Sequence, residues 1–211
     1  MTVIAVSMRS APNHTYDEPR DAISHDWVRL LDSLGVLPLL VPNADRAPER
    51  FLRTFEARGL LLTGGDDLGD KGNESARDRA ESRLLVYCLD AGLPVLGVCR
   101  GLQVINQHYG GSLARRIDGH VACEHDVLLH APLGGLPSGA TTRVNSYHQD
   151  GVHQHQLAPE LDAVAVSPDG LVEALRHPAL PVLAIQWHPE RPEPSSALGR
   201  QVLREWLATC I

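Results

Sequence analysis

The sequence has no surplus of basic residues: its 211 residues hold 19 Lys and Arg against 26 Asp and Glu, a net charge of −7 at pH 7. Such a chain presents no basic surface for a nucleic-acid partner. It also lacks an apolar run of membrane-spanning length, and its first residues resemble a strand rather than a signal peptide. We therefore expect a soluble, cytoplasmic protein with a small-molecule substrate and with neither a nucleic-acid nor a membrane partner.

Cysteine is scarce, and its spacing excludes a disulfide framework. The four cysteines show no paired spacing, and they stand at Cys88, Cys99, Cys123 and Cys210. Two short pairs of metal-binding residue types occur, His153-Gln-His155 and Cys123-Glu-His125, but neither joins a second pair at structural-zinc spacing. The sequence predicts no metal and no cofactor.

Internal repeats, low-complexity tracts and interdomain linkers are also missing, and 43% of the residues are hydrophobic. This favours one domain over residues 1–211 with a sizeable core. In the first half, strand-like and helix-like patterns alternate. The expected strands are 3–7, 36–41, 60–63 and 95–98, and the expected long helices are 21–34, 75–91 and 102–109. A shorter helix is expected to begin at Pro48 and to end at Gly59, with Phe51, Leu52 and Phe55 on one side.

The second half has shorter segments separated by Pro and Gly turns, which favours mixed or antiparallel pairing. The expected strands are 126–130, 141–145, 163–167, 171–176 and 182–187, followed by a terminal amphipathic helix over 196–210. Alternating strands and helices imply a mainly parallel sheet covered on both faces. The predicted fold is α/β, three-layered, with a small antiparallel addition to the sheet.

The most informative segment is Pro94-Val-Leu-Gly-Val-Cys-Arg-Gly-Leu-Gln103, in which Gly-x-Cys-x-Gly follows an apolar run. This pattern is typical of a nucleophile elbow, a sharp strand-to-helix turn that presents a reactive side chain. Glycines on both sides allow the close backbone approach that the turn requires. The helix N-terminus favours the thiolate form, so Cys99 is the candidate nucleophile.

A cysteine nucleophile needs a base and a group that orients the base. The expected strand 182–187 runs into His188-Pro-Glu190, beyond the carboxyl end of a core strand, where active sites form in open α/β sheets. His188 is the candidate base and Glu190 the group that fixes its tautomer. The alternative is a turn that merely ends a strand, and the presence of Cys99 disfavours it.

The reaction also needs donors for a developing oxyanion. Thr63-Gly-Gly-Asp-Asp67 follows the strand that precedes the nucleophile strand, so a glycine N–H can approach a reacting carbonyl. The backbone N–H of Arg100, the residue after the nucleophile, is the second candidate donor.

These motifs, Leu-Thr-Gly-Gly-Asp-Asp-Leu, Pro-Val-Leu-Gly-Val-Cys-Arg-Gly-Leu-Gln-Val-Ile-Asn and Ile-Gln-Trp-His-Pro-Glu, resemble those of class I glutamine amidotransferase-like proteins. Within that superfamily the chain is most similar to the γ-glutamyl hydrolase branch, peptidase family C26. The resemblance implies the flavodoxin-like fold of the superfamily and a Cys99, His188 and Glu190 triad, with Gly65 and Arg100 as oxyanion donors. It also implies a γ-glutamyl pocket formed by Gly64, Gln103, Asn145, Ser146, Tyr147 and His148.

Two segments resemble one particular group of hydrolases within this family. The N-terminal stretch 13–21 and the stretch 69–81 look like those of hydrolases associated with surface-polysaccharide biosynthesis, which release glutamate from γ-glutamyl-CDP-amidate. Four arginines are candidates for contacts to a diphosphate, namely Arg9, Arg20, Arg77 and Arg79. The longer Pro-rich stretch after Gly-Gly that is typical of γ-glutamyl-γ-aminobutyrate hydrolases is absent.

The predicted reaction is hydrolysis of a γ-glutamyl amide through a thioester on Cys99. Two alternative enzymes share the triad: a γ-glutamyl-γ-aminobutyrate-type hydrolase and the glutaminase subunit of an amidotransferase. A non-enzymatic alternative is a substrate-binding sensor with the same fold, which the intact triad disfavours. Two assemblies stay open, a homodimer and a complex with a synthase, the latter in the case of a glutaminase.

Overall fold

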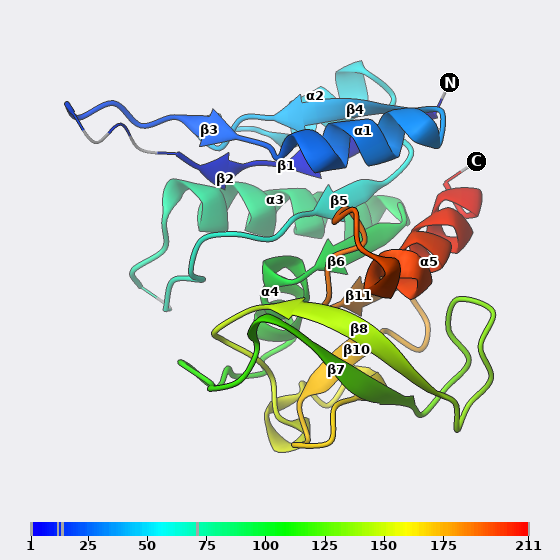
Figure 1. The fold of residues 1–211 in the computed structure, drawn as a ribbon. Helices are drawn as coiled ribbons and strands as arrows, with labels where there is room; N and C mark the ends of the chain where they lie inside the picture. Colours follow the sequence, from blue (N-terminus) through cyan, green and yellow to red (C-terminus); the bar gives the residue numbers. More distant parts are fainter. Residues whose placement is uncertain (1, 12, 14, 71, 211) are drawn as a thin grey trace.

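The computed structural model describes residues 2–11, 13, 15–70 and 72–210. Within these ranges nine strands form a sheet in the order β4-β1-β5-β6-β11-β10-β9-β7-β8 (Figure 1). The strands are β1 (Thr2–Ser7), β4 (Val36–Val41), β5 (Leu60–Leu62), β6 (Val95–Val98), β7 (Val121–Leu129), β8 (Thr141–Tyr147), β9 (Asp162–Val166), β10 (Val172–Arg176) and β11 (Val182–Ile185). A separate small hairpin pairs β2 (Arg9–Ser10) with β3 (Asp21–Ala22).

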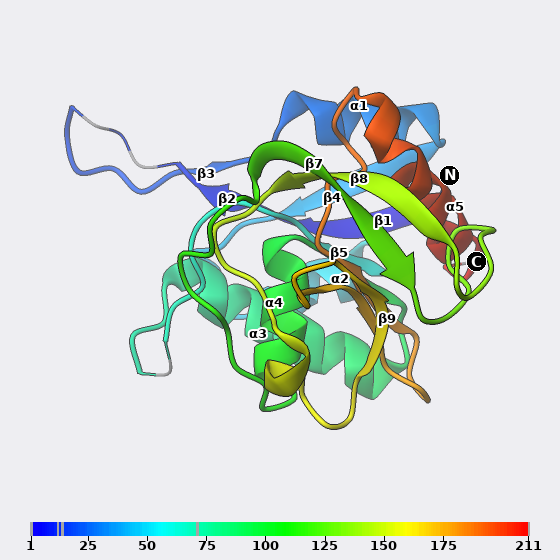
Figure 2. The same ribbon diagram turned by 60° about the horizontal axis from the view of Figure 1, so that its bottom comes forward.

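The sheet has a parallel and an antiparallel half, as the sequence predicts. Strands β4, β1, β5, β6 and β11 pair in parallel. Strands β10, β9, β7 and β8 continue the sheet with antiparallel pairing. Figure 2 shows β7 and β8 as a long twisted pair, and β10 and β9 lie between this pair and the parallel strands. The antiparallel addition therefore has four strands, and the α/β fold is confirmed.

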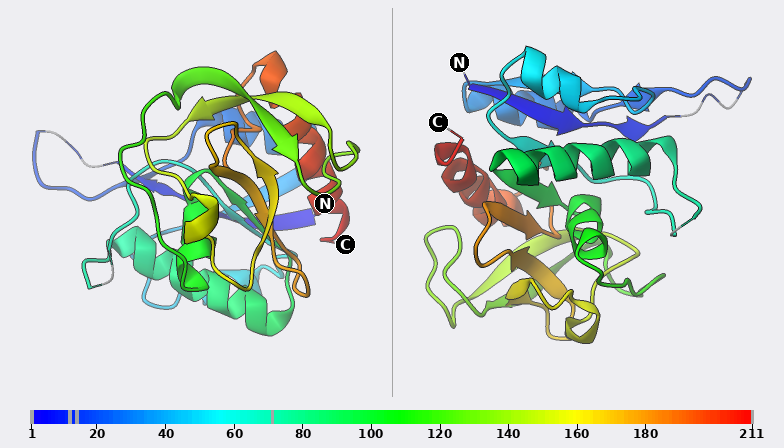
Figure 3. Two further views of the ribbon diagram at one scale, coloured as in Figure 1. Left: turned by 90° about the horizontal axis from the view of Figure 1, so that it is seen from below. Right: turned by 180° about the vertical axis from the view of Figure 1, so that it is seen from behind.

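Helices cover both faces of the parallel strands (Figure 3). Apolar residues of α1 (His25–Ser33) and α5 (Ala197–Ala208) share one core with β1, β6 and β11. Residues of α2 (Glu49–Thr54), α3 (Ala76–Ala91) and α4 (Arg100–His108) form a second core on the opposite face. In the described part of the chain, no helix has the length and apolar character to span a bilayer.

Two predicted helices differ in detail from the structure. The helix expected from residue 21 begins at His25, because the Asp21 carboxylate binds the backbone and side-chain amides of Asn43 while the Ser24 hydroxyl accepts from Asp26 N. The helix expected from Pro48 ends at Thr54, and Phe55, expected on its apolar side, is 54% exposed. Glu56 follows with a positive φ of 49°, which turns the chain before Gly59.

The elbow between β6 and α4 has the strained geometry that its sequence predicts. Cys99 has φ 54° and ψ −105°, a conformation that costs a non-glycine residue free energy. Glycines allow the neighbouring elements to approach: a Cβ on Gly97 would lie 2.7 Å from the Gly101 carbonyl carbon, and one on Gly101 would lie 2.4 Å from the Leu62 carbonyl oxygen. The position of Cys99 thus depends on two residues that have no side chain.

Substituting Gly101→Ala should therefore displace α4 from β5. Because the added methyl meets backbone rather than a flexible side chain, we expect a loss of about 1–3 kcal/mol in the free energy of unfolding. Urea unfolding measures this loss, and the alkylation rate of Cys99 should fall in parallel. Gly135→Ala is the control, since its positive φ adds backbone strain but no atom lies within 4 Å of the new Cβ. Equal losses in the two variants would contradict the packing argument.

Candidate active site

Three neighbouring parallel strands deliver the predicted catalytic segments to one edge of the sheet. Strand β6 pairs with β5 on one side and with β11 on the other. Cys99 follows β6, Gly64 and Gly65 follow β5, and His188 follows β11. The carboxyl ends of parallel strands share one edge, so these segments meet there.

His188 and Glu190 form a close buried pair. The His188 Nδ1 atom lies 2.6 Å from Glu190 Oε1, and the two side chains are 7% and 6% exposed. Asn145 holds the backbone of the histidine from the other side, because its Oδ1 accepts from His188 N at 2.8 Å and its Nδ2 donates to His188 O at 3.0 Å. With Nδ1 occupied, Nε2 is the nitrogen left to exchange a proton.

The Cys99 thiol and the His188 ring lie close together beside Gly64. A Cβ on Gly64 would lie 2.9 Å from His188 Cε1 and 3.6 Å from Cys99 Sγ. Burial alone would lower the pKa of His188, but the negative charges of Glu190 and of the Cys99 thiolate raise it to about 10. The His188 ring is therefore protonated at neutral pH.

The Gly64–Gly65 loop is fixed by a buried arginine that sequence reasoning did not place. Arg77 of α3 donates to the carbonyl oxygens of Thr63 at 2.7 Å, of Gly64 at 3.2 Å and of Gly65 at 2.6 Å. The C=O and N–H of one peptide point in opposite directions. The hydrogen bond from Arg77 to the Gly64 carbonyl therefore leaves the Gly65 N–H pointing away from Arg77. An oxyanion donor must be free of other partners in this way.

Glu81 connects this arginine to the elbow. Its carboxylate contacts Arg77 Nε at 2.8 Å and also pairs with the guanidinium of Arg100, which pairs with Asp78 as well. The Arg77, Arg100 and Glu81 side chains are at most 2% exposed. The one sequence signal for this network was the spacing of Arg77 and Glu81, four apart on a helix, which is more typical of a surface pair.

Two cavities meet at Cys99. One of about 190 Å³ includes Gly65, Asp66, Arg100, Gln103, Tyr147 and His148 in its lining. The other, of about 270 Å³, includes Arg9, Trp27, Gly64, Gly65, Tyr147, His188 and Arg191. A substrate that reacts at Cys99 can therefore place one part on each side of the thiol.

The predicted γ-glutamyl residues divide into two groups. Gly64, Gln103, Tyr147 and His148 line a cavity, and Gln103 Nε2 donates to the Asp150 carbonyl at 2.9 Å. Asn145 and Ser146 are fully buried. The Asn145 amide is bound to the His188 backbone, and the Ser146 hydroxyl donates to the His120 carbonyl at 2.7 Å. The side chains of this second pair shape the site from within rather than line it.

The four arginines predicted as diphosphate contacts lie in different surroundings. The proposed diphosphate contact of Arg77 is wrong, because its side chain is 0% exposed and is bound to the Gly64–Gly65 loop. Arg20 and Arg79 are exposed and line neither cavity, whereas Arg9 lines the larger one. Arg191, which the sequence did not single out, lies beside Arg9 in that lining, with its guanidinium 4.2 Å from the Tyr147 ring centre. His14 and Lys71, within the two stretches singled out above, lie outside the described residues.

Comparison with known proteins gives the family. The peptidase C26 family model matches residues 2–190. The chain belongs to this family. Relatives include the γ-glutamyl-CDP-amidate hydrolase of Campylobacter jejuni, 26% identical over 97% of both chains, and the γ-glutamyl-γ-aminobutyrate hydrolase PuuD of Escherichia coli, 30% identical over 89% of this chain and 86% of PuuD.

A third relative is a subunit of the glutamine-hydrolysing GMP synthase of Thermococcus kodakarensis, 31% identical over 79% of this chain and 82% of that protein. Among solved structures, a GMP synthase subunit from Thermoplasma acidophilum matches with a TM-score of 0.74 and 25% identity, over 100% of this chain and 94% of that one. A glutamine amidotransferase from Thermotoga maritima, 15% identical with a TM-score of 0.68 over 99% and 96% of the chains, shares the fold. The family resemblance and fold predicted from the motifs are therefore confirmed.

The contact between His188 and Glu190 predicts an alkaline limit to activity. His188 is protonated below its pKa of about 10 and loses its charge as the pH rises through that value. Glu190→Gln removes the largest contribution that raises this pKa, so the alkaline limb of kcat/KM for glutamate release should move to lower pH. The stability that the charged pair contributes is complete below pH 6.5 and is lost as the pH rises through about 10. An unmoved limb in the Gln variant would contradict this role of Glu190.

The contacts of Arg77 predict a selective loss of turnover. Lys cannot bind three carbonyl oxygens and a carboxylate at once. Arg77→Lys should therefore loosen the Gly64–Gly65 loop and lower kcat by roughly a hundredfold, since small misplacements of positioning groups cost that much. Alkylation of Cys99 by iodoacetamide needs no oxyanion donor and should keep its rate. The control is Arg79→Lys, two positions along the same helix and exposed; a kcat equal to that of this control would contradict the role of Arg77.

Proposed function

We propose that this protein hydrolyses a γ-glutamyl amide of a small molecule through a thioester on Cys99. The observation that carries the proposal is that the Cys99 thiol and the His188 ring lie together beside Gly64, since a Cβ on that glycine would be 3.6 Å from Cys99 Sγ and 2.9 Å from His188 Cε1. The buried Glu190 carboxylate behind His188 supplies the third member of the set. This combination matches the roles of nucleophile, acid–base group and orienting group in acyl transfer.

In the proposed reaction the thiolate of Cys99 attacks the γ-carbonyl carbon, and the backbone N–H groups of Gly65 and Arg100 bind the resulting oxyanion. When the tetrahedral species collapses, the C–N bond breaks and the proton of His188 Nε2 goes to the departing nitrogen. His188, now neutral, takes a proton from water as the water oxygen attacks the thioester. The C–S bond then breaks, which releases glutamate and restores the thiolate and the imidazolium.

As the substrate we propose γ-glutamyl-CDP-amidate, with the γ-glutamyl group in the smaller cavity and the rest in the larger one. Arg9 and Arg191 line the larger cavity, and two guanidinium groups suit the oxygens of a diphosphate. Asp67 lines the smaller cavity, is exposed and suits an α-ammonium group, whereas Asp66 and Asp150 in the same lining are bound to Arg77 and Arg115. The likeness to the Campylobacter jejuni γ-glutamyl-CDP-amidate hydrolase over 97% of both chains supports the same choice. With this substrate we also propose the role in surface-polysaccharide biosynthesis that the sequence resemblance implies.

Two other reactions at the same site stay as alternatives. The likeness to PuuD favours γ-glutamyl-γ-aminobutyrate, whose leaving group carries one carboxylate. The likeness to the glutamine-hydrolysing GMP synthase of Thermococcus kodakarensis favours free glutamine, with ammonia passed to a synthase partner. Neither leaving group uses two arginines, so the lining of the larger cavity favours the diphosphate.

The nucleophile is tested with Cys99→Ala. Loss of a nucleophile costs roughly a millionfold in rate, so glutamate release should fall to background on every γ-glutamyl substrate. The matched control is Cys210→Ala: burial raises the pKa of the Cys210 thiol to about 11, which leaves it unreactive near neutral pH. Substantial turnover by the Cys99 variant would overturn the proposed mechanism.

The leaving group is tested by comparing three substrates, namely γ-glutamyl-CDP-amidate, γ-glutamyl-γ-aminobutyrate and glutamine. We expect the highest kcat/KM for the diphosphate substrate. Arg9→Ala and Arg191→Ala should each raise KM for the diphosphate substrate by roughly tenfold and should change glutamine hydrolysis little. A charge-assisted contact is worth about 1.5–3 kcal/mol when it is desolvated, and it is worth less at these partly exposed positions. Arg29→Ala, an exposed arginine of α1, is the control. Equal losses for all substrates would contradict the diphosphate assignment.

A further inference from the structure

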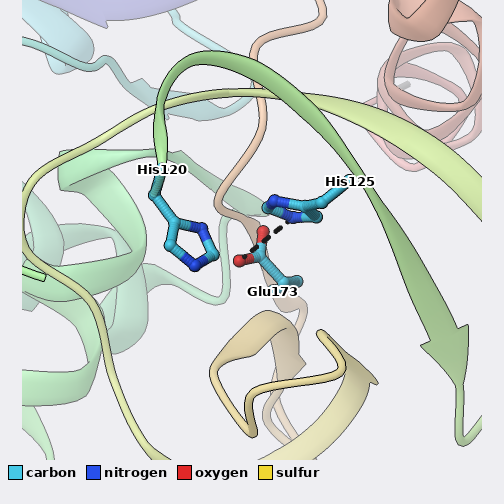
Figure 4. Close-up of side chains that lie close together, drawn as sticks. All are labelled: His120, His125 and Glu173. Carbon is cyan, nitrogen blue, oxygen red and sulfur yellow. Dashed lines mark ion pairs between the residues drawn. The ribbon is translucent and has the colours of Figure 1, made fainter. Parts of the chain in front are cut away.

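A second cluster of titratable side chains lies in the antiparallel half of the sheet, apart from Cys99. Figure 4 shows His120, His125 and Glu173, and one potential ligand atom from each lies within 4.8 Å of the others. Glu173 is on β10 and is 0% exposed, His125 is on β7, and His120 comes directly before β7. His148, directly after β8, contacts the same carboxylate.

The polar atoms of this cluster lack ordinary partners. Among the described residues, neither carboxylate oxygen of Glu173 and neither ring nitrogen of His125 has a hydrogen-bond partner, and the same holds for His148 Nε2. Buried polar atoms are nearly always paired, because an unpaired one loses its hydration without compensation. One ion can bind a single nitrogen of each ring, so Glu173, His125 Nε2 and His148 Nε2 are the atoms that lack a common partner.

The partner must be positive, as the tautomer of His148 shows. His148 Nδ1 lies 3.0 Å from the Asp150 carbonyl, which can only accept, so Nδ1 carries the proton. In the neutral ring Nε2 is then an acceptor, and it lies 3.6 Å from Glu173 Oε1, which is also an acceptor. Two acceptors face each other stably only around a cation or an additional proton.

The distances fit a metal ion better than a shared proton. His125 Nε2 and His148 Nε2 lie 3.4 Å and 3.6 Å from Glu173 Oε1, beyond the usual hydrogen-bond length. Two donors bound at about 2.1 Å to a tetrahedral zinc ion are separated by about 3.4 Å. The nitrogens and the oxygen therefore have the spacing of neighbouring ligands in one coordination sphere.

His120 has the second contact that metal-binding histidines typically make. Its Nε2 lies 2.9 Å from Asp169 Oδ2, which leaves Nδ1 as the free lone pair. The hydroxyl of Ser146 is 3.5 Å from Nδ1, but its proton is donated to the His120 carbonyl at 2.7 Å. A carboxylate on the outer nitrogen orients the ring and strengthens the other nitrogen as a ligand.

We propose that Glu173, His125 and His120 bind a divalent transition-metal ion of the zinc class, with His148 as the fourth ligand. Nitrogen and carboxylate donors in this ratio suit Zn²⁺. The expectation of no metal rested on the short pairs in the sequence, and the cluster instead joins residues from β7, β10 and the end of β8. The ion ties the segment that ends in Tyr147 and His148 to β10, whose neighbour β11 leads to His188.

The test is a zinc titration of the full chain in competition with a chromophoric chelator, after removal of bound metals. The Cys99→Ala background removes the reactive thiol as a competing zinc ligand, so the outcome does not depend on the proposed hydrolysis. We expect one Zn²⁺ per chain and a rise in Tm on binding. His125→Ala and Glu173→Gln should each weaken binding at least tenfold and abolish the rise in Tm.

His155→Ala is the matched control, since His155 is exposed and stacks on His153, its partner in the pair that the sequence suggested. Binding of zinc that is lost in this variant but kept in Glu173→Gln would overturn the proposal, as would the absence of stoichiometric binding. If Glu173→Gln does not fold by circular dichroism, His120→Ala replaces it. Co²⁺ gives a second measurement: its visible absorption in the parent should indicate nitrogen and oxygen ligands and should disappear in His125→Ala.

Discussion

Glu81 lies between the guanidinium groups of Arg77 and Arg100, and the geometry around Cys99 depends on this buried contact. One arginine binds the carbonyls of the loop after β5, and the other is the first residue of α4. A single carboxylate therefore sets the spacing between the two backbone segments that flank the thiol. Because removal of one partner leaves uncompensated buried charge, such networks are sensitive to substitution even where the pairs add little net stability.

The network compensates for strain at the elbow. Cys99 adopts a positive φ that unconstrained cysteines avoid, and it persists because both neighbouring elements are fixed. The close contact of Gly101 with the Leu62 carbonyl holds α4 against β5, and the β6 register is fixed on both sides by parallel pairing. Strain and packing together place Cys99, which is 6% exposed, at the point where the two cavities meet.

The sequence was sufficient for features that short patterns encode. The elbow glycines, the His188-Pro-Glu190 segment and the alternation of strands and helices each lie within a few consecutive residues. Contacts between distant positions were not accessible in this way. Arg77 resembled a surface arginine because the carbonyls it binds are more than ten positions away, and helix α1 starts late because Asp21 binds Asn43. Likewise, Asn145 and Ser146 point to opposite faces of β8 and are both buried, Asn145 against the His188 backbone and Ser146 against the His120 carbonyl.

The double contact of Asn145 with the His188 backbone has a mechanical consequence. Strand β8 carries Asn145 and ends at Tyr147, which lines both cavities. A ligand that displaces Tyr147 therefore acts on the His188 backbone through the side-chain amide of Asn145, which is only two residues from Tyr147. The strand segment that lines both cavities and the backbone of His188 are thus one connected unit, held together by two hydrogen bonds.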